Sequence, residues 1–68
     1  MTDTLKLEMA IKRAGFTKRE IAKRLGLSEM GLHQKMNNVT EFKASEIANL
    51  YVLLHLESLE EQQQIFFN

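Results

Sequence analysis

The chain has 68 residues and a formal net charge of zero, with nine Lys and Arg against nine Asp and Glu. This length suits one small domain over residues 1–68. The absence of Cys excludes disulfide bonds and thiolate metal sites, and it fits a reducing cytoplasm. With no Pro and only three Gly, the composition predicts an all-α fold. We expect no signal peptide, because the N-terminus has no charged stretch followed by an apolar core. We expect no membrane span, because the longest apolar run is only residues 50–54.

The charges are distributed unevenly along the chain. Residues 1–45 hold nine bases and five acids, nine minus five or +4, whereas residues 46–68 hold four acids and no base, or −4. A basic region can face phosphate, and an acidic region avoids it. The asymmetry therefore favours a nucleic-acid-binding surface in the first two thirds of the chain. The alternative is an ordinary solvated charged surface, which would have the same charge distribution.

The first predicted helix covers residues 3–14. Leu7, Ile11 and Ala14 follow the i, i+4, i+7 spacing of a buried helical stripe. Gly15 suits the residue just past a helix end, and Phe16 then enters the core.

A second predicted helix begins after Thr17, because Thr17 and Glu20 have the spacing of a capping box. It buries Ile21, Ala22 and Leu25 and ends at residue 25 before Gly26, which tolerates a positive φ. The third predicted helix covers residues 29–36, capped by Ser28, with Leu32 and Met36 on its inner side.

Asn37 and Asn38 are predicted to stop the third helix, since Asn tolerates the left-handed conformation. A fourth helix over residues 44–54 or 55 follows from the spacing of its apolar side chains. A last short helix follows Ser58, which forms a second capping-box pattern with Glu61. The apolar stripe of the fourth helix is Ile47, Leu50, Tyr51 and Leu54.

Residues 17–36 have the residue types and spacing of two short helices joined by a three-residue turn. Ala22 is small enough to let the helices approach closely, and Gly26 makes a tight bend. Leu27, Leu32 and Met36 anchor the second helix so that its outer face stands clear of the domain. Such a face can enter a DNA major groove.

The stretch from Thr17 to Asn38, TKREIAKRLGLSEMGLHQKMNN, resembles phage Cro/repressor-type helix-turn-helix regulators, which are lambda-repressor-like. The resemblance implies a compact bundle of about five short helices, with Thr17 and Lys18 contacting the DNA backbone and Asn37 and Asn38 beside phosphate past the end of the third helix. It implies base contacts from Glu29, Met30 and Gln34. In the DNA-binding hypothesis, the DNA backbone is anchored by Lys18, Arg19, Lys23 and Lys35. The full set of candidate DNA- or partner-binding residues is Thr17, Lys18, Arg19, Ser28, Glu29, Met30, His33, Gln34, Lys35, Asn37 and Asn38.

Departures from the family pattern bear on DNA readout. Lys35 stands where the family has an apolar residue, and we expect Met36 to supply that packing. A carboxylate at Glu29 is repelled by phosphate and can usefully accept only from cytosine N4, and Met30 can meet only a thymine methyl. Gly31 costs about 1 kcal/mol of helix stability relative to Ala, but it would allow the close approach of a protein partner. Glu29 also has a purely structural interpretation, because an acid in the first turn complements the helix dipole.

Residues 44–67 carry more apolar side chains than one stripe can bury. This excess predicts an interface in a homodimer or a heteromeric complex. The alternative is that the last helix folds back and covers the fourth within one chain. The candidate interface residues are Tyr51, Val52, Leu53, Ile65, Phe66 and Phe67.

The leading hypothesis is a cytoplasmic phage-type transcriptional regulator of a lytic–lysogenic switch that binds operator DNA as a dimer. The alternative is an antirepressor that complexes the cognate repressor and masks its DNA-binding face. A third and weaker hypothesis is the antitoxin of a toxin–antitoxin pair. We expect no enzymatic activity, cofactor, small-molecule substrate or metal, since His33 and His55 lack partners at ligand spacing.

Overall fold

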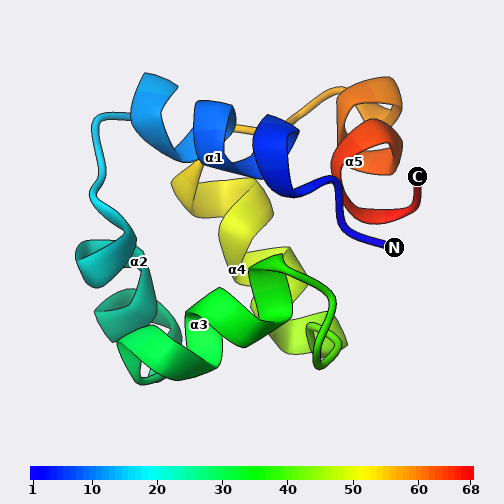
Figure 1. Ribbon diagram of the computed structural model, residues 1–68. Coiled ribbons are helices and arrows are strands. Elements are labelled where there is room, and N and C mark those ends of the chain that lie inside the picture. Colours follow the sequence, from blue (N-terminus) through cyan, green and yellow to red (C-terminus); the bar gives the residue numbers. More distant parts are fainter.

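The computed structural model describes residues 1–68, which form five α-helices and no strand. They are α1 (Thr4–Arg13), α2 (Lys18–Leu25), α3 (Glu29–Met36), α4 (Ala44–Leu53) and α5 (Leu59–Phe66). The predicted all-α fold is confirmed. Figure 1 shows α2 and α3 at one end of the molecule and α1 beside α5 at the other, with α4 between them and the two chain termini adjacent. None of these helices is long and apolar enough to cross a membrane.

Four of the five helices end with the same backbone device. A residue with positive φ follows the helix, and the next N–H bonds to the carbonyl oxygen five residues back. After α2, for example, Gly26 has φ 70° and the Leu27 N–H lies 2.8 Å from the Ala22 oxygen. The positive-φ residues are Gly15, Gly26, Asn38 and His55. Three of the residues that follow them are apolar and packed on the core, so each stop also directs the chain inward: Phe16, Leu27 and Leu56.

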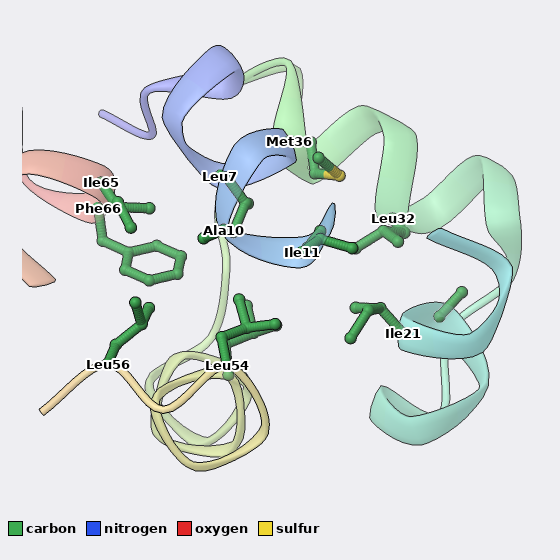
Figure 2. Packing of buried hydrophobic residues seen from close by; sticks show 12 residues of the cluster. Leu7, Ala10, Ile11, Ile21, Leu32, Met36, Leu54, Leu56, Ile65 and Phe66 are labelled. Carbon is green, nitrogen blue, oxygen red and sulfur yellow. The ribbon is translucent and has the colours of Figure 1, made fainter. Parts of the chain in front are cut away.

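All five helices contribute to one apolar core (Figure 2). Leu7 of α1, Ile21 of α2, Leu32 of α3 and Leu50 of α4 have almost no exposed surface. Met36 is equally buried, so it supplies the packing that was expected of it. Burying a Leu, Ile or Met side chain contributes about 1.5–3 kcal/mol, which makes this cluster the main source of stability.

The C-terminal helix folds back into its own chain. Ile65 and Phe66 are buried in the core, and the Phe66 ring lies edge-on to Phe42 and Tyr51, at centroid distances of 5.8 and 5.7 Å. The expectation that Ile65 and Phe66 form an intermolecular surface is therefore wrong for this fold. The reason is that α5 packs against α1 and places these side chains inward, which the apolar pattern did not distinguish from an exposed surface.

A buried ion pair joins α3 to α4. Lys35 Nζ lies 2.7 Å from Glu46 Oε1, and the two side chains are 12% and 10% exposed. Glu46 also accepts the backbone N–H of Lys43, at 2.8 Å. Burial raises the pKa of Glu46, but the hydrogen bonds from Lys35 and Lys43 outweigh burial and hold the pKa below its usual value. Lys35 is thus a structural residue, and the expectation that it anchors the DNA backbone is wrong.

Lys35→Met should lower the free energy of unfolding by about 2–4 kcal/mol, because it leaves the Glu46 carboxylate buried without its cation. The double variant Lys35→Met/Glu46→Gln should recover at least about half of that loss, because neither remaining side chain carries a charge. Urea unfolding followed by circular dichroism measures both. Equal stability of Lys35→Met and the parent would contradict the structural role of the pair.

The pH dependence of the free energy of unfolding tests the same ion pair independently. The folded-state pKa of Glu46 lies below its unfolded value, so the pair's contribution is present above about pH 4.3 and is lost as pH falls through the folded pKa. The parent should therefore lose stability below this pH more steeply than the double variant.

Candidate nucleic-acid interface

The two helices α2 and α3 pack together as a helix-turn-helix pair. Only Gly26, Leu27 and Ser28 separate them. Gly26 takes the left-handed conformation that the bend requires, and Leu27 is half-buried against the core. The Ser28 hydroxyl accepts the Gly31 N–H at 2.9 Å and caps α3. These contacts set α3 on the surface with a satisfied N-terminus.

The start of α2 has the capping box that the sequence predicted. The Thr17 hydroxyl accepts the Glu20 N–H at 3.1 Å, and Glu20 Oε1 accepts the Thr17 N–H at 2.9 Å. These hydrogen bonds with Thr17 lower the pKa of the Glu20 carboxyl. The Thr17 side chain is therefore occupied by the cap, and the first turn of α2 is ordered before any ligand arrives.

The outward side of α3 carries four side chains at helical spacing. Met30, His33 and Asn37 are exposed, and Gln34 is half-buried. Positions 30, 33, 34 and 37 share one face, opposite the inward Leu32 and Met36. A shallow hollow on this side is lined by Lys18, Glu29, Met30, Leu32 and His33. The structure thus brings most of the residues predicted to read bases onto one accessible surface.

Two of the expected phosphate contacts are already engaged in ion pairs. Lys18 Nζ lies 3.0 Å from Glu8 Oε2 of α1, and Arg19 Nε lies 3.9 Å from Glu29 Oε2 of α3. All four side chains are substantially exposed, so these pairs are weak and readily exchanged. Glu29 therefore faces α2 at the edge of the α3 surface. The pairing of Lys18 with Glu8 had no signal in the sequence, because it joins different helices.

Asn38 has a structural task that the sequence did not predict. Its side-chain amide accepts the Thr2 N–H and donates to the Thr2 oxygen, both at 2.9 Å. The Thr4 hydroxyl donates to the Met36 oxygen nearby. Together these bonds attach the N-terminus to the end of α3. In this conformation the backbone of Thr2 occupies the side-chain oxygen of Asn38 and one of its amide N–H groups, so a phosphate contact from Asn38 stays a prediction. Asn37 Nδ2 donates to the His33 oxygen at 2.8 Å and lies 3.4 Å from His33 Nδ1, and the Asn37 side chain stays exposed.

Gly31 lies behind the outward side of α3. A Cβ added there would meet the Ser28 hydroxyl oxygen at 3.1 Å and the Leu27 Cβ at 4.0 Å. That position faces the turn and not the open surface. The sequence had suggested that Gly31 lets a binding partner approach closely. The geometry indicates instead that the missing side chain of Gly31 leaves space for the Ser28 hydroxyl that caps α3.

One comparison with known proteins bears on the class of protein that carries this surface. A profile of the family described as bacterial regulatory protein, Fis family, matches residues 6–38. The match covers 33 of the 68 residues and contains most of α1, all of α2 and α3, and the turn between them. No curated protein and no solved structure matches the chain. The match supports a bacterial helix-turn-helix regulator that binds DNA.

Ser28→Ala should lower the free energy of unfolding by about 1 kcal/mol, because the α3 N-terminus loses the only side-chain hydrogen bond that caps it. Ser45→Ala is the matched control. Ser45 is exposed within the first turn of α4 and should change stability by no more than about 0.5 kcal/mol. Urea unfolding measures both, and equal effects would contradict the capping role.

Proposed function

We propose that the chain is a transcription regulator that binds operator DNA by laying α3 in the major groove. The observation that carries this proposal is the outward side of α3, where Met30, His33 and Asn37 are exposed beside the capped start of α2. A helix held this way can reach base edges while the preceding helix meets the backbone. The resemblance to Cro/repressor-type regulators supports a role in a phage lytic–lysogenic switch in the bacterial cytoplasm.

The roles within this surface follow from side-chain chemistry. Lys18 and Arg19 would exchange their carboxylate partners for phosphates. Gln34 would pair with adenine, and Met30 would contact a thymine methyl. Glu29 would accept from cytosine N4 or remain with Arg19. Few strong hydrogen-bonding readers are available, so sequence discrimination would be modest.

Operator binding of this type uses two copies on half-sites roughly 34–36 Å apart. Val52 and Phe67 are the members of the expected interface set that remain exposed, at 74% and 65%. Tyr51 and Leu53 are half-buried against the core and would contribute only their outer atoms. We propose Val52 and Phe67 as contacts between copies on DNA.

Glu29→Gln should strengthen binding to a generic duplex about three- to tenfold at 50 mM salt, because it removes a carboxylate beside phosphate and frees Arg19. Lys18→Ala should weaken binding by a similar factor and reduce the salt slope by about one. Fluorescence anisotropy between about 50 and 200 mM salt measures both.

Glu57→Gln is the matched control for charge, because it changes the net charge equally at an exposed residue outside the helix-turn-helix. An equal gain for Glu57→Gln and Glu29→Gln would assign the effect to net charge and contradict the proposed surface. No binding by any variant at the lowest salt would contradict DNA binding itself.

A second candidate function uses the same surface against protein. Glu29 is exposed and anionic, and Met30 beside it is 64% exposed. Met suits adaptable protein contacts, and an acid suits the basic face of a DNA-binding repressor. The chain would then act as an antirepressor that masks the repressor's DNA-binding face, with weak or no DNA binding of its own.

The two functions predict opposite effects of one substitution. Glu29→Lys should strengthen DNA binding, but it should weaken an antirepressor complex by about tenfold or more, because it places like charges together. The measurement is release of the cognate repressor from its operator as the chain is added. Release that Glu29→Lys leaves unchanged would contradict the antirepressor function.

A further inference from the structure

An open hollow, which we call the α1 hollow, lies along α1 where the chain passes into α2. Figure 1 shows this passage at one corner of the molecule. The hollow has a volume of about 340 Å³. Its apolar wall includes Leu5 and Met9, one helical turn apart and 67% and 62% exposed, and the half-buried Phe16. Exposed apolar side chains gathered around a hollow are typical of a surface that meets another molecule.

The rim of the α1 hollow carries more bases than acids. Lys12 and Lys18 are its cations, and Glu8 is its single anion. Glu8 is already paired with Lys18, at 3.0 Å, whereas Lys12 has no ion-pair partner. The α1 hollow is therefore complementary to an apolar group that has negative charge beside it.

The occupant that fits this chemistry is a side chain carried by a partner protein. Leu5 and Met9 are both more than half exposed, so the hollow would leave much of a small ligand in water, whereas ligand pockets cover most of their ligand. A large apolar side chain on an amphipathic helix enters such an open groove while its own backbone stays outside. Met at position 9 suits this contact, because its flexible side chain adapts to the shape of the entering group.

We infer that the α1 hollow, defined by Leu5, Met9, Lys12, Phe16 and Lys18, docks an acidic amphipathic helix of a partner protein. The contact goes beyond DNA binding. It uses no side chain of α3, and it forms without DNA.

One residue connects the α1 hollow with the helix-turn-helix surface. Lys18 also lines the hollow beside α3, and the proposed function assigns it a phosphate. A partner carboxylate held at Lys18 would occupy that cation, so docking lowers the affinity for DNA. This consequence rests on the proposed function, whereas the docking itself does not.

The test is a titration without DNA, in which amide NMR spectra of the isotopically labelled chain are recorded as a synthetic helical peptide of about 18 residues is added. The peptide carries Phe and Leu one helical turn apart on one face and Glu on both sides of them. The amide signals of residues 5–18 should shift, and those of residues 29–36 should not. A second peptide with Lys in place of every Glu should bind at least about tenfold more weakly.

Two matched pairs of variants locate the contact. Lys12→Glu should weaken binding of the acidic peptide at least about tenfold, and Lys23→Glu by no more than about threefold. Both remove an exposed base without an ion-pair partner from the last turn of a helix. Met9→Gln should weaken binding about fivefold. Met30→Gln should not, although the two Met side chains are similarly exposed, at 62% and 64%. Circular dichroism checks that each variant is folded.

Several outcomes would overturn the inference. Equal binding of the two peptides, or equal losses in Lys12→Glu and Lys23→Glu, would show attraction without a defined site. The absence of any shift at about 1 mM peptide would exclude docking of this chemistry. Shifts of the same signals with phosphatidylglycerol vesicles, but not with the peptide, would assign the α1 hollow to a lipid surface. Shifts of these signals on concentrating the chain alone would assign it to a second copy.

The docking and the DNA binding fail separately in this design. Saturating peptide should raise the dissociation constant of a generic duplex about three- to tenfold, measured by fluorescence anisotropy. The same peptide concentration should leave duplex binding by Lys12→Glu unchanged, because this variant does not hold the peptide. Peptide shifts in a chain that binds no duplex would contradict the proposed function alone. Duplex binding without peptide shifts would overturn the docking site, and peptide shifts with unchanged duplex affinity would overturn the link through Lys18.

Discussion

The ion pair between Lys35 and Glu46 is the constraint on which the exposed side of α3 depends. Lys35 lies on the inward side of α3 with Leu32 and Met36, so its bond to α4 limits rotation of α3 about its own axis. Rotation by one residue, about 100°, would bury part of the outward side and expose an unpaired charge. A leucine at position 35 could pack as well, but it would not penalise that rotation as strongly. The pair therefore gives α3 a single orientation.

Hydrogen bonds between side chains and the backbone at both ends of α3 also fix its orientation. Its start is held by the Ser28 cap and its end by Asn38 and Thr4, which attach it to the N-terminal segment. Interactions with DNA or protein then require little ordering of α3 itself, so less of the binding energy is lost to conformational entropy. The arrangement is consistent with a surface formed before its ligand binds.

Local chemistry made part of this structure predictable from sequence. The Thr17 box, the Ser28 cap and the Gly26 bend involve residues within five positions of one another, and each has a known backbone requirement. The Lys35–Glu46 pair and the Asn38–Thr2 bonds join distant residues, so spacing could not reveal them. One signal was present: Glu46 is the only charged residue between 44 and 54, four positions before the buried Leu50. A lone acid at a buried position requires a cation, and Lys35 at an apolar position was the complementary irregularity.

The same limit explains the error over α5. Ile65 and Phe66 are apolar in either arrangement, and only the packing of α5 on α1 decides which side is covered. What remains exposed after that packing is more informative than the total apolar content. It consists of Leu5 and Met9 on α1, Leu59 and Phe67 around α5, and Val52 on α4.

The surface ion pairs decide how the helix-turn-helix can meet a polyanion. Lys18 and Arg19 each hold a carboxylate at the surface, where an ion pair is worth about 0–1 kcal/mol and is screened at physiological salt. A phosphate contact gains in addition from the release of condensed counterions, so DNA can displace these carboxylates at small cost. Glu29 is the exception, because it stays on the surface after Arg19 has left it and then repels phosphate. A basic protein face would attract the same freed carboxylate, so Glu29 is the residue whose charge most directly separates DNA from a repressor as ligand.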